Sequence, residues 1–208
     1  MNAGFARLRG GLSYQGMSLG LMALVASAAL VLANDLTRER IAEAEARDLQ
    51  AMLAQVLPAG FADNDLLADT SRVGTEGGGR LVYRARRSGQ VIGAVFQSSA
   101  RGYAADITVL VGVDAGGTLL GVRVVKHVET PGLGDKIEVG KSKWILGFDG
   151  KSLGTLSVAQ WAVKKDGGVF DQFAGATITP RAVVKAVRSG LEFFSAHRDE
   201  ILAGANAQ

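Results

Sequence analysis

The chain has 208 residues, among them 28 Gly, 3 Pro, 2 His and no Cys. The lack of Cys excludes disulfides, thiolate-held iron–sulfur clusters, Cys zinc sites and thiol nucleophiles, and two His are too few for a typical multi-His metal centre. A formal charge of +3 is too balanced to indicate nucleic-acid binding, and a hydrophobic share of 48% excludes a disordered chain and allows one sizeable core.

The first predicted element is an apolar helix near the N-terminus. No charged residue occurs between Arg9 and Asp35, and residues 16–33 are almost wholly apolar or small. At about 1.5 Å rise per residue, this stretch and its uncharged flanks can cross a hydrocarbon core of roughly 30 Å. We therefore predict a transmembrane helix over residues 16–33. Small residues at 26–28 and 31–33 leave a cleaved signal peptide open, and a buried helix of a soluble domain is a third interpretation.

Positive charges around this helix bear on its orientation. Arg7 and Arg9 precede it and Arg38 and Arg40 follow it, so the positive-inside count is close to a tie. The short N-terminal segment favours residues 1–15 as a cytoplasmic tail, which places the remainder of the chain on the periplasmic side.

Residues 34–60 form the next predicted helical segment. Ala and Glu are frequent here, apolar residues recur among charges, and Pro58 and Gly60 end the pattern. We predict that this helix connects the membrane segment to a single soluble domain over residues 61–208.

The soluble domain is predicted to be rich in strands. Residues 61–79 are largely polar and predict a loop, after which β-branched runs alternate with Gly-containing turn signals. Short connections favour antiparallel pairing, since a parallel crossover needs about a dozen residues. The expected fold class is α+β, with one mainly antiparallel sheet flanked by helices. The predicted strands cover residues 80–87, 90–97, 106–113, 119–128 and 158–164.

The last predicted element is a helix that begins at Thr179. Thr179 suits the N-cap and Pro180 the first helical position, and apolar residues then recur at helical spacing as far as Phe194. Elsewhere, four Arg between residues 80 and 87 favour an exposed strand face. The chain's aromatic residues that favour core positions are Trp144, Trp161, Phe170 and Phe173.

The segment before the last helix is the main candidate for a site. It runs from Asp171 to Pro180 and reads Asp-Gln-Phe-Ala-Gly-Ala-Thr-Ile-Thr-Pro. Helix N-termini present free N–H groups and favour phosphate. Gly175 and Ala176 allow another group to approach the backbone closely, and Thr177 offers a hydroxyl. On these grounds the segment can hold a phosphate, and a plain tight turn before a helix fits the residues equally well.

The pattern Asp-x-x-Ala-Gly-Ala-Thr resembles the covalent flavin-attachment motif of the FMN-binding domain family. The resemblance implies a covalent FMN, held by its phosphate in a phosphoester bond to Thr177 and loaded by a separate flavin transferase. It also implies that Gly175 and Ala176 shape the approach and that Asp171 completes the motif. Ala174 stands where family members often have Ser or Thr, but the acceptor position is intact.

A second segment, Glu-Thr-Pro-Gly-Leu-Gly over residues 129–134, is similar to the loop that borders the flavin in this family. Pro131 rigidifies this loop, and its two Gly permit unusual backbone angles and close contact with a flat ring. Thr130 and backbone N–H groups are expected to bond flavin heteroatoms, with Leu133 on the ring face. The cofactor-binding residues implied here are Glu129, Thr130, Gly132, Leu133 and Gly134. The redox chemistry itself would reside on the flavin, so no catalytic side chain and no metal site are expected.

The whole chain is similar to the RnfG family, the G subunits of the Rnf ion-translocating oxidoreductase complexes. The resemblance implies a single-pass protein of the bacterial inner membrane that passes electrons through FMN and has no complete activity alone. The complex would couple ferredoxin and NAD redox chemistry to ion transport. The implied partners are the other proteins of the Rnf complex, the flavin transferase and membrane lipid, and no nucleic acid. Two alternatives stay open: the C subunit of the sodium-translocating NADH:quinone reductase, which is usually a longer chain, and a non-redox membrane-anchored scaffold.

Overall fold

The computed structural model describes residues 12–74 and 79–203, which fall into two units divided after Asp48. The first unit is helical and belongs to α2, Leu12–Val56. The second unit begins at Leu49 and holds the sheet and the remaining helices. Residues 1–11 of the predicted N-terminal tail lie outside the described residues.

The helix α2 contains the predicted membrane segment. By length and composition it is apolar enough to cross a membrane, and none of its most apolar window is buried in the described part of the chain. An apolar surface on all sides is typical of a helix that lies in lipid. Its exposed large apolar side chains include Met17, Leu19, Leu21, Met22, Leu24, Val25, Leu30, Val31 and Leu32.

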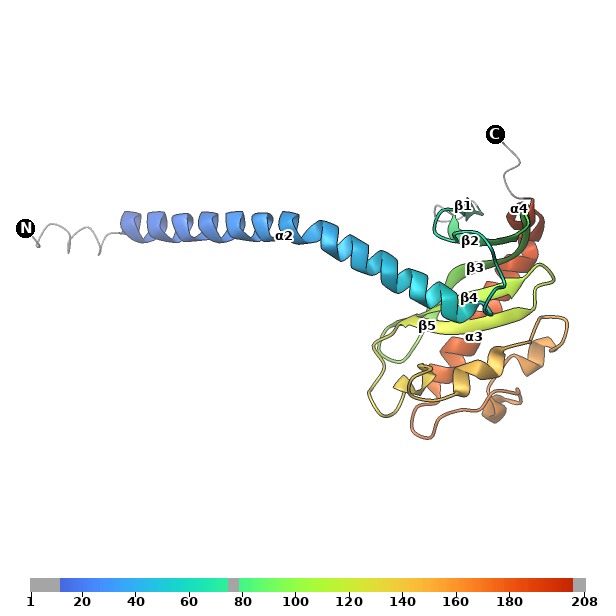
Figure 1. The fold of residues 1–208 in the computed structure, drawn as a ribbon. Coiled ribbons are helices and arrows are strands. Elements are labelled where there is room, and N and C mark those ends of the chain that lie inside the picture. Colours follow the sequence, from blue (N-terminus) through green and yellow to red (C-terminus); the bar gives the residue numbers. More distant parts are fainter. Residues whose placement is uncertain (1–11, 75–78, 204–208) are drawn as a thin grey trace, which may run out of the picture. The chain divides into compact units, whose positions relative to one another are not determined.

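The second unit is built on a five-stranded antiparallel sheet in which each strand pairs with the next along the chain (Figure 1). Four predicted strands are confirmed, and the third strand continues past residue 97. The first strand lies inside the predicted 61–79 loop, where its four polar-rich residues show no alternation. The strands are β1 Thr70–Val73, β2 Arg80–Arg87, β3 Gln90–Arg101, β4 Asp106–Asp114 and β5 Leu119–Lys126.

The predicted strand over residues 158–164 is wrong. A capping box forms at its start, in which the side chains of Ser157 and Gln160 each bond the other's backbone and initiate a 3-10 turn. Further along, Val163 makes only an isolated bridge to Phe170. The segment between β5 and α3 contains four short 3-10 helices: η2 Asp135–Ile137, η3 Trp144–Phe148, η4 Val158–Gln160 and η5 Lys164–Asp166.

The two faces of the sheet pack against different helices. The helix α3, Ile178–Ala196, packs on one face and is followed by α4, Arg198–Leu202. The end of α2, with Val56, packs on the other face. Side chains along a strand point alternately to opposite faces, so Phe96 of β3 joins the α3 core and Val95 joins the α2 core.

Two paired glycines let the end of α2 lie directly on the sheet. Gly112 of β4 is opposite Gly121 of β5 in the strand register. A Cβ atom on Gly112 would lie 2.5 Å from Cγ1 of Val56, and one on Gly121 would lie 2.6 Å from the Val56 carbonyl oxygen. Because these two glycines have no side chains, the backbone of Val56 can lie against the sheet at this point.

The predicted start of the last helix is also corrected. Its first residue is Ile178 and its N-cap is Thr177, not Thr179. Thr179 is the second residue inside the helix, and its hydroxyl donates to the carboxylate of Glu129. Pro180 is the third helical residue, where its missing N–H costs no intrahelical bond.

The arginines of β2 do not form the uniformly exposed face that their pattern predicts. Arg84 is buried, and its Nε lies 3.1 Å from Oδ1 of Asp69. Arg86 forms an ion pair with the same carboxylate. The guanidinium of Arg80 lies 4.2 Å from the ring centroid of Phe193, and partial burial lowers the pKa of Arg80. These charges serve contacts within the domain.

Candidate functional site

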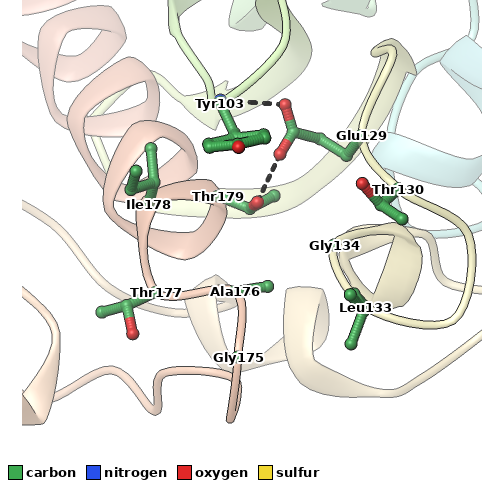
Figure 2. Close-up of a pocket in the computed structure, with 10 residues that line it drawn as sticks. All are labelled: Tyr103, Glu129, Thr130, Leu133, Gly134, Gly175, Ala176, Thr177, Ile178 and Thr179. Carbon is green, nitrogen blue, oxygen red and sulfur yellow. Dashed lines mark hydrogen bonds between the residues drawn. The ribbon is translucent and has the colours of Figure 1, made fainter.

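A cavity of about 260 Å³ lies where the loop after β5 meets the start of α3 (Figure 2). It brings together three stretches that are far apart in the sequence, around residues 103, 129–134 and 175–179. Most of the predicted site residues line it, but Asp171 and Gly132 do not. The lining residues are Tyr103, Glu129, Thr130, Leu133, Gly134, Gly175, Ala176, Thr177, Ile178 and Thr179.

The loop after β5 enters the cavity through a tight turn. The N–H of Leu133 donates to the carbonyl of Thr130 at 3.1 Å. Pro131 occupies the second position of the turn, and Gly132, at φ +78°, occupies the third. This is the arrangement of a type II turn, which requires positive φ at the third position and therefore favours Gly. The turn presents Leu133, 44% exposed, at the cavity.

A second turn of the same kind precedes α3. The N–H of Ala176 donates to the carbonyl of Phe173 at 3.2 Å, and Gly175 at the third position has φ +79°. A Cβ atom on Gly175 would lie 3.8 Å from Cδ2 of Leu133. The two turns therefore approach each other, and residues of both line the cavity.

Thr177 lies at the N-terminus of α3 with its hydroxyl uncommitted to the helix. Its backbone is helical, and its side chain makes no capping hydrogen bond. The N–H groups of Ile178 and Thr179 have no acceptor within the helix, because the first turn of a helix lacks preceding carbonyls. The first turn also contains no acidic side chain. A hydroxyl and free N–H groups at a helix N-terminus together suit a phosphate.

Among the described residues that line the cavity, Glu129 is the one with a charged side chain, and it is 5% exposed. Its Oε1 accepts the N–H of Tyr103 at 3.0 Å and that of Ala104 at 3.4 Å. Its Oε2 accepts the hydroxyl of Thr179, which is 1% exposed (Figure 2). The carboxylate is therefore satisfied by the protein, and it ties the β3–β4 loop to the first turn of α3.

His127 supports the backbone of the same loop. Its Nδ1 accepts the N–H of Glu129 at 3.1 Å, and its Nε2 lies 2.9 Å from Oε1 of Glu138. An accepting Nδ1 assigns the neutral ring with its proton on Nε2, which donates to Glu138. His127 therefore acts here as a structural residue at the end of the strand.

Asp171 lies outside the cavity, at the start of the candidate segment 171–180. Its carboxylate is exposed and lies 2.6 Å from Nζ of Lys164. Its backbone carbonyl accepts the indole N–H of Trp144 at 2.8 Å, and the Trp144 ring packs edge-on against Phe173. Phe173 and its neighbours Trp161 and Phe170 are buried, as expected for core aromatics.

Three lining residues are not among the predicted site residues: Tyr103, Ile178 and Thr179, of which the last two fall within the candidate segment 171–180. Tyr103 is 69% exposed and follows the long strand β3, where nothing in the local pattern marks it. Ile178 is 46% exposed although it begins an amphipathic helix, and only the structure shows this exposure. Thr179 fits the pattern of a helix cap, and its bond to a residue 50 positions away has no signature in the sequence.

Comparison with known proteins identifies similar chains. A model of the FMN-binding domain matches residues 102–192, which cover every residue that lines the cavity, and a model of the RnfG N-terminal region matches residues 12–56. The G subunit of the ion-translocating oxidoreductase complex of Stutzerimonas stutzeri is 54% identical over 87% of this chain and 80% of its own length. Its namesake from Cereibacter sphaeroides is 53% identical, over 90% and 86% respectively.

A solved structure has a similar fold. The crystal structure of NqrC from Shewanella oneidensis matches with a TM-score of 0.50 and 24% sequence identity, covering 70% of this chain and 74% of that one. At this identity the likeness concerns the fold alone.

Proposed function

The chain belongs to the RnfG family, the G subunits of ion-translocating oxidoreductase complexes, and we propose that it passes electrons through FMN attached covalently to Thr177. When bound, FMN supplies the redox chemistry, and the protein supplies position and electrostatics. The observation that carries the proposal is the free hydroxyl of Thr177 at a helix N-terminus, inside the cavity that the FMN-binding domain encloses.

The residues of the cavity fit an FMN group. The N–H groups at the start of α3 suit its phosphate, and Gly175 and Ala176 leave room beside the backbone. The apolar side chains of Leu133 and Ile178 are partly exposed and offer a surface to a flat ring. A cavity of about 260 Å³ is smaller than the roughly 300–1,000 Å³ of pockets that enclose whole ligands of drug size. We therefore expect it to take part of the flavin and leave the remainder at the surface.

In the attachment reaction, Thr177 is the nucleophile. Its Oγ1 attacks the flavin-side phosphorus of a flavin-bearing pyrophosphate, such as a flavin dinucleotide. A new P–O bond to Oγ1 forms, the bridging P–O bond breaks, the nucleotide monophosphate leaves, and the hydroxyl proton is released. The carboxylate of Glu129 already accepts hydrogen bonds from Thr179 and two backbone N–H groups, so we assign the base to the flavin transferase.

The proposal also includes the membrane topology of the whole chain. We propose residues 1–15 as a cytoplasmic tail, 16–33 as the membrane helix, 34–60 as the connecting helix and 61–208 as a periplasmic FMN-binding domain. A single helix cannot form an ion path, so ion transport would require the other proteins of the complex. Within that complex this chain would contribute an electron-transfer step to a reaction that couples ferredoxin and NAD chemistry to ion movement.

The proposal is tested by expressing the full chain with a flavin transferase and examining it on a denaturing gel under ultraviolet light. We expect a fluorescent band, a flavin mass increment on the peptide that contains Thr177, and loss of both in Thr177→Val. An exposed threonine outside the cavity, Thr155, provides the matched control Thr155→Val, which should remain fluorescent. A dark wild-type band under these conditions would contradict covalent attachment.

A further inference from the structure

Two threonines stand two positions apart at the start of α3, and only one of them is available for attachment. Thr177 is half-buried and makes no side-chain bond to the helix. Thr179 is 1% exposed, and its hydroxyl donates to Oε2 of Glu129. Both residues lie at the N-terminus of α3, so the helix end alone does not distinguish them.

Two glycines leave the space that the Glu129 carboxylate occupies beside Thr179. A Cβ atom on Gly134 would lie 2.9 Å from Oγ1 of Thr179 and 2.8 Å from Cβ of Glu129. A Cβ atom on Gly102 would lie 2.6 Å from Oε1 of Glu129. The backbone approaches the carboxylate from both sides, and any larger side chain would displace it.

A buried carboxylate in this position acts on Thr179 in two ways. It holds the hydroxyl in the interior, where Thr179 is 1% exposed and out of reach of a flavin donor, and its negative charge opposes a phosphoester at the neighbouring oxygen. By holding Thr179 it also fixes the first helical turn, and therefore the position of Thr177 at the mouth of that turn (Figure 2).

We propose that Glu129 and Thr179 are positioning residues for flavin attachment, which sequester the wrong hydroxyl and orient the correct one. This inference rests on the proposed attachment at Thr177. Neither residue is assigned a bond to the flavin, since the carboxylate and the Thr179 hydroxyl are already engaged with each other.

The test measures how fast the full-length apo chain, purified in detergent, is loaded by flavin transferase with a flavin dinucleotide as donor. The variants are Thr179→Val, which keeps the shape and removes the hydroxyl, and Glu129→Gln, which keeps the shape and removes the charge. Thr179→Ser retains the hydroxyl, and Thr155→Val is the control for an exposed position. A hydrogen bond to a buried charged group is strong enough that we expect kcat for loading to fall at least about tenfold in the first two variants. Thr179→Ser and Thr155→Val should load at a rate close to wild type.

Two further readouts separate positioning from simple loss of folding. Thermal unfolding of each apo variant reports the folded fraction, and peptide mass mapping reports which threonine carries the flavin. If Thr179→Val is not folded, the test rests on the loading rate of folded Glu129→Gln compared with that of the wild type. Wild-type rates of loading in folded Thr179→Val or Glu129→Gln would overturn the inference while leaving attachment at Thr177 intact. A wild-type chain that carries no flavin at Thr177 would instead overturn the proposed function.

Discussion

Substitution of Gly134 by Ala tests the close packing around the cavity. The backbone of Gly134 has φ −87°, which any residue can adopt, so the cost of a methyl group is steric. That methyl would lie 2.8 Å from Cβ of Glu129 and 2.9 Å from Oγ1 of Thr179. Overpacking of this kind costs about 1–3 kcal/mol. Weakening of the buried hydrogen bond to a carboxylate adds about 1.5–3 kcal/mol where the bond is lost.

The matched control is Gly132→Ala in the neighbouring turn. A Cβ atom there meets no atom within 4 Å, but φ is +78°, so its cost is conformational. A non-Gly residue in the left-handed region costs roughly 1–2 kcal/mol. Where the hydrogen bond is lost, we therefore expect Gly134→Ala to lose about 2.5–6 kcal/mol, which exceeds the loss in Gly132→Ala.

Thermal unfolding of the apo chain in detergent measures the difference. For a domain of this size, about 1 kcal/mol corresponds to a Tm shift of roughly 2–4 °C, so Gly134→Ala should lower Tm by roughly 5–24 °C. The rate of flavin loading should fall with it, since the same methyl displaces Glu129 from Thr179. A Gly134→Ala chain at least as stable as Gly132→Ala would refute the steric reasoning.

The remaining predictions concern the domain and its setting. Gly121→Ala should lower Tm, because its methyl would lie 2.6 Å from the Val56 carbonyl oxygen; an unchanged Tm would show that the helix end can shift freely. The bidentate hydrogen bond from Arg181 lowers the pKa of Asp166 below its usual value of 3.8. This ion pair therefore stabilises the fold at pH values above 3.8. The stabilisation is lost as the pH falls through the lower pKa of the folded state. Asp166→Asn should therefore have a slightly lower Tm than wild type at pH 7 and an equal Tm in strong acid, and a difference that grows in acid would contradict this sign. Protease added to intact spheroplasts should cleave residues 61–208 from the periplasmic side, and protection there would contradict the proposed topology.

Local patterns in the sequence were sufficient for most elements of the fold. An uncharged apolar stretch, alternating β-branched runs and a helical apolar stripe each follow from the period of one element, so α2, four strands and α3 were predictable. The candidate segment from Asp171 to Pro180 is contiguous, so its Thr177 hydroxyl and its Gly175 turn are properties of neighbouring residues. Resemblance then added the loop over residues 129–134.

Other features depended on contacts between distant residues. The strand predicted over residues 158–164 gave way to a local capping box at Ser157, and Arg84 proved to be buried beside Asp69. Tyr103 entered the site because the β3–β4 loop folds beside residue 129, which no periodicity in either segment indicates.

Thr177 and Thr179 differ in ways that the sequence does not show and the tertiary structure does. In the sequence both are threonines near a helix start, and Thr179 beside Pro180 is the better candidate for the cap. In the tertiary structure the helix begins at Ile178, a carboxylate 50 residues away binds the Thr179 hydroxyl, and Thr177 makes no side-chain bond to the helix. Sequence alone determined that a threonine hydroxyl stands before α3, since that depends on neighbouring residues. Only the fold decided which hydroxyl is free, since that depends on which distant donors and acceptors meet in the buried interior.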